Sequence, residues 1–299
     1  MSARTDFIAG IGLRLLATFL MTAMSAAVRA VAETVPIGQL IFWRSFLALI
    51  PICLYMMWQH EFPSALSTKH PRLHVTRSLL GIFAMAMFFT ALTYLPLANA
   101  QALGYLAPIL VLPLAAVVLK EQLTPRIFGA VFLGFTGVIF LLWDAFSLPT
   151  EGALIGVAAG LVFAFTMAFV RVHTKTMTQT ESSAAIAFYL ALVGSVVGFG
   201  TIFFGWIALS TSMFAWLALA GFLGGIGHIV ANEATARAPV STLAPFDFTG
   251  LIWALGFDLI LFAIVPGPVG LIGVFAITFA ALIVTFSKSK AVKNPTTGV

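Results

Sequence analysis

The sequence is poor in charge and in cysteine. Asp, Glu, Lys and Arg together make up 8% of the 299 residues, whereas 61% are hydrophobic. A soluble domain has about 25% charged residues, so the 15 basic and 10 acidic side chains are too few to cover a surface in water. The composition therefore excludes a soluble globular protein, a disordered chain and a coiled coil. It predicts a polytopic integral membrane protein.

The single cysteine, Cys53, excludes an intramolecular disulfide. The sequence also has no glycine-rich phosphate loop, no catalytic triad motif and no HExxH motif. His70 and His74 have the spacing of two zinc ligands on a helix, but no acid or cysteine completes such a set. We therefore expect no metal and no cofactor.

Ten apolar segments follow one another, separated by short connections that contain Pro, Gly or charged residues. A membrane-spanning helix needs about 20 apolar residues, and a run of this length can satisfy its backbone in lipid only as a helix. We predict an all-α polytopic membrane protein with ten transmembrane helices, over residues 7–29, 37–58, 74–95, 98–119, 125–143, 152–171, 183–204, 212–236, 240–262 and 268–286.

The basic residues orient this bundle. With the N-terminus inside, every Lys and Arg except Arg29 and Arg44 falls on the cytoplasmic side of the predicted spans, as the positive-inside rule requires. Both termini are therefore expected in the cytoplasm. This distribution accounts for the net charge of +5, so the expected partners are the lipid bilayer and a small-molecule substrate, and not nucleic acid.

Segments in the two halves of the chain resemble each other. Met24–Arg29 is similar to Thr166–Arg171, and Phe42–Trp43 aligns with Phe188–Tyr189. These matches predict a first five-helix repeat over residues 1–147, a second over 148–287 and a cytoplasmic tail over 288–299. Because five is odd, the two repeats must be inverted relative to each other, and such repeats place a substrate site near the membrane midplane.

Two motifs connect the chain with a known family. One is the stretch from Tyr105 to Gly137, with a central proline, a Glu shortly before a second proline and then a glycine-rich span; the other is Phe42–Ala48, with an arginine in the second span. Together with the ten spans they resemble the drug/metabolite transporter superfamily, EamA type. The nearest likeness is to the bacterial aromatic amino acid exporters. The second half departs from the pattern, since no acid precedes Pro266.

The resemblance implies a secondary transporter in the bacterial inner membrane that exports small metabolites, with aromatic or other neutral amino acids as the expected cargo. It implies alternating access through a central cavity between the repeats, and is consistent with a monomer. The alternative within the superfamily is an exporter or importer of another small metabolite or drug-like compound. An integral-membrane enzyme would need acids and histidines clustered at the membrane surface, and the sequence shows no such cluster. A channel usually assembles several subunits around a pore with rings of like residues, whereas the ten-span duplication favours a self-contained pathway.

The strongest polar constellation lies in the eighth and ninth predicted spans. His228 and Asn232 are four residues apart, so they share a helix face, and Asp247 lies at a similar depth in the next span. Asp247 and Asp258 are eleven residues apart and are expected on one face of a continuous helix. His228, Asn232 and Asp247 suit binding of an amino group or a proton, and they suit interhelical hydrogen bonds equally well.

Arg44 lies about seven residues, roughly 10 Å, inside the second span, where a charge is costly. We expect either an ion pair with Asp258 that joins two helices or a contact with the substrate. Pro108 and Pro245 lack the backbone N–H that a helix ladder needs, so they are expected to be hinge positions for gating.

Two further groups complete the predicted substrate site. The first is a polar cluster where the third and fourth spans meet: Tyr94, Asn99, Gln101 and Tyr105. The alternative role of these residues is to anchor the chain at the membrane interface. The second is a set of Phe, Met and Trp side chains that would give a cavity an adaptable wall: Phe83, Met87, Phe163, Met167, Phe248 and Trp253. The alternative is that these side chains face lipid.

Overall fold

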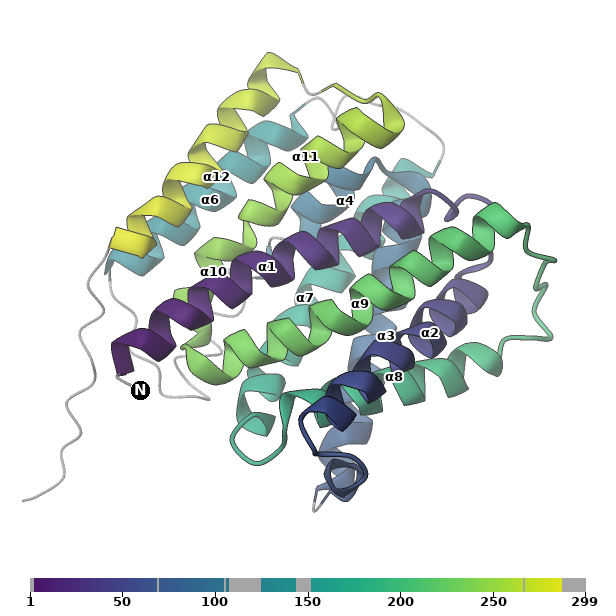
Figure 1. The fold of residues 1–299 in the computed structure, drawn as a ribbon. Helices are drawn as coiled ribbons and strands as arrows, with labels where there is room; N and C mark the ends of the chain where they lie inside the picture. The colour runs from purple at the N-terminus through teal and green to yellow at the C-terminus, as the bar shows by residue number, and fades with distance from the viewer. Residues whose placement is uncertain are drawn as a thin grey trace, which may run out of the picture.

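The computed structural model describes residues 3–68, 70–104, 106–107, 125–143, 152–265 and 267–286. Within these residues the regular structure is helical, and no β-strand occurs. The elements, shown in Figure 1, are α1 (Ala3–Arg29), α2 (Ile37–Trp58), the short 3-10 helix η1 (Ser64–Leu66), α3 (Pro71–Tyr94), α4 (Leu97–Gly104), α6 (Pro125–Leu142), α7 (Ala153–Met177), α8 (Ser183–Phe199), α9 (Thr211–Arg237), α10 (Val240–Asp247), α11 (Thr249–Phe262) and α12 (Pro268–Phe286).

The predicted all-α polytopic fold is confirmed. By length and composition, five of the described helices are apolar enough and long enough to cross a membrane: α1, α2, α3, α7 and α9. The predicted span over 37–58 coincides with α2, and the spans over 125–143 and 268–286 correspond to α6 and α12. α4 occupies the start of the span predicted over 98–119, and the remainder of that span lies outside the described residues.

The predicted span over 240–262 is two helices and not one. α10 ends at Asp247 and α11 begins at Thr249. Pro245 has no N–H to offer the helix ladder, and the Thr249 hydroxyl donates to the Phe246 carbonyl oxygen at 2.7 Å, a local bond that competes with backbone pairing. Asp247 and Asp258 therefore do not share one face of a continuous helix, which corrects the prediction.

The contacts between helices recur with their partners exchanged. α1 packs along α9 and α7 packs along α3, while α1 contacts α11 as α7 contacts α4. α6 pairs with α12 along one edge of the molecule, and α2 pairs with α8 (Figure 1). Two related five-helix halves predict such an exchange, because each contact then has a counterpart five spans later. The predicted boundary at 147 and 148 and the tail over 288–299 lie outside the described residues.

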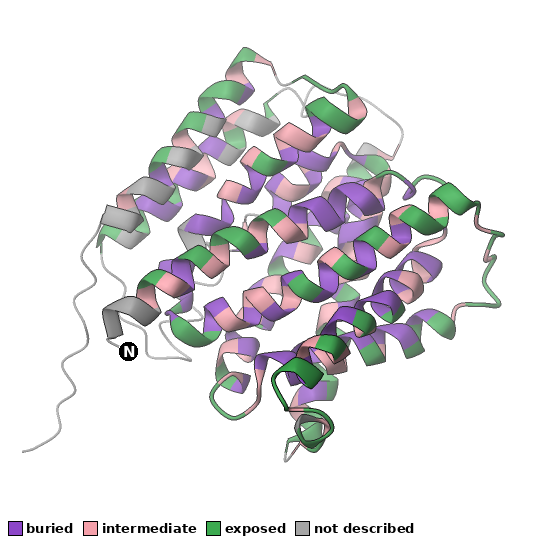
Figure 2. Cartoon of the chain, viewed as in Figure 1, coloured by how far each residue is buried: buried purple, intermediate pink, exposed green. Residues whose placement is uncertain are grey.

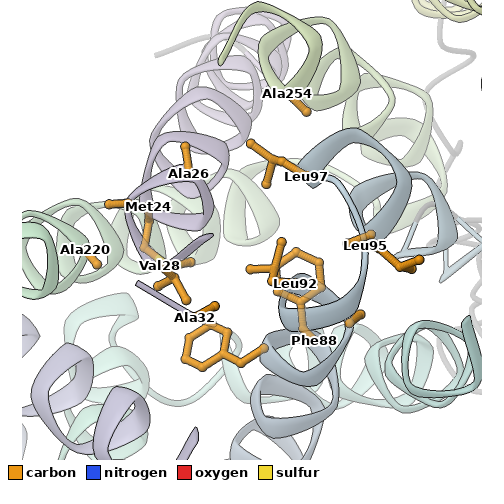
Figure 3. Close-up of a cluster of buried hydrophobic side chains, with 14 of the residues drawn as sticks. Met24, Ala26, Val28, Ala32, Phe88, Leu92, Leu95, Leu97, Ala220 and Ala254 are labelled. Carbon is orange, nitrogen blue, oxygen red and sulfur yellow. The ribbon is translucent and has the colours of Figure 1, made fainter. Parts of the chain in front are cut away.

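A buried apolar cluster fills one end of the bundle. Its side chains come mainly from the last turns of α1 and α3 and the first turns of α4 and α9, and Figure 3 shows Val28, Leu92 and Leu97 gathered between these helices. By the charge rule this is the end away from the cytoplasm. Since lipid is as apolar as these side chains, close van der Waals packing holds such a layer together in a bilayer.

The outward faces of the helices are also apolar. Leu154, Phe203 and Ile260 are each more than three-quarters exposed, and Figure 2 shows exposed and buried positions alternating around α1 and α9. An exposed apolar surface of this extent is unsuited to water and suited to lipid. It agrees with the integral membrane location that the composition predicts.

Glycines allow α2 and α9 to approach closely. A Cβ atom on Gly221 would lie 2.6 Å from the Cβ of Leu47, and one on Gly225 would lie 2.7 Å from the Ala48 carbonyl oxygen. Neither distance leaves room for a methyl group, so the two helices meet backbone to backbone, as small-residue interfaces in membranes do. This contact brings Arg44 of α2 against α9.

Candidate functional site

A cavity of about 220 Å³ lies inside the bundle. Its walls are the middle of α1 and of α3, the second halves of α7 and α9, and α10, with single side chains from α2, α4 and α8. These segments lie between the buried apolar cluster and the end that carries the N-terminus. The cavity is therefore displaced toward the side that the charge rule assigns to the cytoplasm.

At the end of the cavity nearer the N-terminus, one aspartate binds two arginines. Arg14 Nε of α1 donates to Asp247 Oδ1 at 2.5 Å, and Arg171 Nη1 of α7 donates to Asp247 Oδ2. Asp247 is buried, whereas the two arginines keep a small exposed fraction. The charged group thus links α1, α7 and α10. In sequence the partners are 233 and 76 residues from Asp247, and the sequence analysis did not identify either arginine.

Two further buried arginines reach the same cavity without an acid. The Arg44 side chain is among the largest that are fully buried, and none of its three guanidinium nitrogens has a hydrogen-bond partner. Arg77 of α3 is 4% exposed; its Nε donates to Thr174 Oγ1 at 3.4 Å, and its Nη1 has no partner. Among the described residues, no Asp or Glu lies within ion-pair distance of either side chain.

Arg77 was missed because the sequence places it near the cytoplasmic end of a span, where a long side chain can reach water. α3 begins at Pro71, so Arg77 is about 9 Å inside the helix. It is four residues before Gly81 and eight before Met85, and all three line the cavity. The sequence signal for Arg77 was its helical spacing, because Gly81 and Met85 share its face of the helix.

The predicted ion pair between Arg44 and Asp258 is not formed. Asp258 Oδ2 instead accepts a hydrogen bond from the Ala98 backbone N–H at 2.8 Å, in the first turn of α4. The first N–H groups of a helix have no partner within it, and a carboxylate opposite them is stabilising. Asp258 therefore connects α11 to α4, and Arg44 is left facing the cavity.

The predicted trio of His228, Asn232 and Asp247 does line one cavity, but its members have separate partners. Asn232 Nδ2 donates to the Ser183 carbonyl oxygen at 3.0 Å, which ties α9 to the start of α8. His228 Nε2 is buried without a hydrogen-bond partner, and the positive charges of Arg44 and Arg77 both act on its ring. Asp247 binds arginines and not His228.

The apolar wall of the cavity combines methionines with phenylalanines. The rings of Phe88 and Phe163 lie with their centroids 4.7 Å apart. The predicted residues Gln101, Phe163 and Met167 belong to the lining, and further methionines come from α1 and α3: Met21, Met24 and Met85. Methionine side chains adapt to irregular shapes and aromatic rings, so this wall suits an apolar group of variable outline.

Several predicted wall residues lie elsewhere. Phe83, Tyr94 and Trp253 are each more than 40% exposed on the outside of the bundle. Phe83 is two residues from Gly81, which turns it about 200° around α3 and away from the cavity. Phe248 is buried against Gly134 of α6.

The remaining predicted residues are not part of the described lining. Met87 and Asn99 are partly buried and do not line the cavity. Tyr105 and Pro108 lie outside the described residues, and of Pro245 the structure describes the backbone, within α10.

This geometry can be compared with known proteins. Residues 8–143 match the EamA-like transporter family. This match supports the predicted superfamily, and it supports a transporter rather than an enzyme. A solved crystal structure superposes on this chain with a TM-score of 0.75 at 18% identity, covering 94% of this chain and 98% of the other, which shows a shared fold.

Curated relatives extend the match over almost the whole chain. The pseudopaline exporter of Pseudomonas aeruginosa is 22% identical over 93% of this chain and 96% of its own length. The S-adenosylmethionine uptake transporter of Rickettsia felis is 23% identical over 98% of this chain and 97% of its own. These relatives transport small metabolites and are not aromatic amino acid exporters, which corrects the predicted nearest likeness.

Proposed function

We propose that this protein is an EamA-like transporter that carries a small organic metabolite across the membrane through the cavity by alternating access. The observation that supports this most strongly is the cavity itself, which is lined by residues from both halves of the sequence and combines polar with apolar side chains. Ligand sites in membrane carriers are expected at such a repeat interface. A few converging polar groups in a mainly apolar pocket are typical of small-molecule sites.

The proposed cycle starts from the state described above. The apolar cluster of Val28, Leu92, Leu97 and Ala220 fills the outer side, so the cavity of this state is reached from the side of Arg14 and Arg171. In the opposite state the outer cluster would separate, and α1, α7 and α10, already linked by Asp247, would close over the cavity. The break between α10 and α11 offers a place where the backbone can bend.

The cargo class follows the relatives. One of them exports a metabolite and the other takes one up, which favours the broader of the two sequence hypotheses, a carrier of small organic metabolites. Export of neutral or aromatic amino acids remains the more specific hypothesis. It is tested as one part of a wider panel.

The test is counterflow in proteoliposomes. Purified protein is reconstituted, and exchange of labelled compounds is measured for amino acids, organic acids and S-adenosylmethionine. Saturable exchange of at least one compound is expected. Ala231 lines the cavity on α9, so Ala231→Trp should block exchange, because the indole would occupy the path. Ile226, on the same helix, is 40% exposed to the outside, and Ile226→Trp is the matched control.

Two results would contradict this proposal. Wild-type protein that exchanges none of the compounds would remove the transport assignment. Full exchange by well-folded Ala231→Trp protein would show that cargo does not pass through this cavity.

A further inference from the structure

We propose that the cargo is an organic anion whose carboxylate or phosphate group binds between Arg44, Arg77 and His228, with its apolar part against the Met and Phe wall. This inference rests on the proposed function and names the chemistry of its cargo. It starts from the charge of the cavity. Among the described lining residues, four arginines, Arg14, Arg44, Arg77 and Arg171, face a single acid, Asp247.

The two pairs of arginines in the cavity differ in how they are neutralised. Asp247 forms ion pairs with Arg14 and Arg171. Arg44 and Arg77 form no ion pair with a described acidic residue, and they lie close enough for their positive charges to repel each other. A buried charge without a partner strongly destabilises a folded protein. In a membrane protein such charges mark functional positions and face a cavity or a path. A bound anion would supply the missing negative charge.

The position of both guanidinium groups depends on glycine. A Cβ atom on Gly224 of α9 would lie 2.8 Å from Arg44 Nη2 and 2.9 Å from Arg44 Nε. A Cβ atom on Gly81 of α3 would lie 3.1 Å from Arg77 Nη1. The two glycines thus leave space for the charged ends at the cavity wall. A pair of planar guanidinium groups offers several N–H donors in fixed directions, an arrangement that matches the oxygens of a carboxylate or a phosphate.

The rest of the cavity limits the remainder of the molecule. Phe88 and Phe163 present their rings, and Met85 and Met167 present flexible thioethers. These groups offer contact area without fixed polar partners. The cargo therefore has an apolar body, and its charged group is at one end. His228 Nε2, which is buried and unpaired, adds one more polar atom on the anion side.

Binding of matched probes tests the proposal directly. Full-length protein purified in detergent is titrated calorimetrically with 3-phenylpropionate, with phenyl phosphate and with the neutral 3-phenylpropanamide. The carboxylate and the amide have nearly the same shape and differ in charge. Wild-type protein should bind at least one anion about tenfold more tightly than the amide, the effect of one or two hydrogen bonds to a charged group. The stronger of the two anions identifies carboxylate or phosphate as the recognised group.

Removing the charge at one side of the site should abolish this preference. In Arg44→Met the anion and the amide should bind with similar affinity. The thermal midpoint of the empty protein should stay the same or rise, because an unpaired buried charge has been removed. A purely structural role of Arg44 predicts the opposite, a fall in the midpoint. Arg126→Met, which changes an exposed arginine in the first turn of α6, should alter neither quantity.

Other outcomes overturn the proposal. Equal binding of amide and anions by wild-type protein, or no binding of either anion, contradicts an anion site. If Arg44→Met does not insert, Arg77→Met gives the same comparison from α3, and an unchanged anion preference in that variant also contradicts the site. Exchange of neutral compounds alone in proteoliposomes would leave the transport function standing and remove the anionic cargo. Arg44-dependent anion binding without exchange of any compound would do the reverse.

Discussion

The two pairs of arginines that line the cavity are neutralised in different ways. Asp247 binds Arg14 and Arg171, and the group connects three helices. Arg44 and Arg77 face the cavity with guanidinium nitrogens that have no partner. The first arrangement satisfies its charges within the protein and therefore contributes to the fold. The second leaves charge available, which is what a site for a charged ligand requires.

The largest expected effect on stability comes from breaking the ion pairs of Asp247. Asp247→Asn leaves Arg14 and Arg171 without their negative partner. Removing one member of a buried ion pair typically costs about 3–5 kcal/mol. Because both arginines keep a small exposed fraction, we expect this variant to lose about 3 kcal/mol of stability. The measurement is the free energy of unfolding in detergent. Anion binding at Arg44 and Arg77 should change little.

A double variant sharpens this prediction. Asp247→Asn with Arg171→Gln removes one unpaired charge again, so part of the lost stability should return. Stability of Asp247→Asn equal to that of wild type would show that the group does not link the helices. If transport nevertheless fell severely, Asp247 would instead be a binding or coupling residue.

The next largest effect is expected on anion binding at Arg44. Gly224→Ala should push the Arg44 guanidinium out of its position, since the new methyl group would lie 2.8 Å from Nη2. The affinity for the preferred anionic probe should fall roughly tenfold, measured by the same titration. Gly129, on α6, has nothing within 4 Å of an added Cβ, so Gly129→Ala is the control. An affinity that survives Gly224→Ala would place the anion away from Arg44.

A smaller effect separates the two aspartates of the broken span. Asp258 accepts a bond from the Ala98 N–H and forms no ion pair among the described residues, so we expect its hydrogen-bonding ability to matter more than its charge. Asp258→Ala should lose about 1 kcal/mol, as for other lost helix caps. Asp258→Asn should stay close to wild type, because asparagine caps as well as aspartate does. Equal losses in both variants would mean that the charge of Asp258 is essential.

The smallest effect is on the outer surface. Phe83 and Trp253 face outward, so Phe83→Leu and Trp253→Leu should each change the free energy of unfolding by less than about 0.5 kcal/mol. Their exchange rates in proteoliposomes should equal that of wild type. A marked loss of transport in either variant would return these residues to the cargo path.

The helix layout could largely be predicted from the sequence. α2 begins and ends where predicted, since Pro36 precedes it and polar residues follow Trp58. The residues that share a cavity were predicted less well. His228, Asn232 and Asp247 were expected together because they lie at similar depth in adjacent spans, and they do line one cavity. Their partners could not be predicted, because helix rotation decides which side chains meet.

The sequence by itself therefore determined the membrane class, most span limits and the likeness to the EamA-like transporters. These depend on local composition, since lipid permits only helices in apolar runs of this length. Only the tertiary structure decided that Asp247 binds Arg14 and Arg171, that Asp258 caps α4, and that Arg44 is left unpaired. Each of these depends on how α1, α2, α7 and α10 are rotated about their axes and on the break at Phe248. Such contacts join residues far apart in the chain, and no short stretch of sequence encodes them.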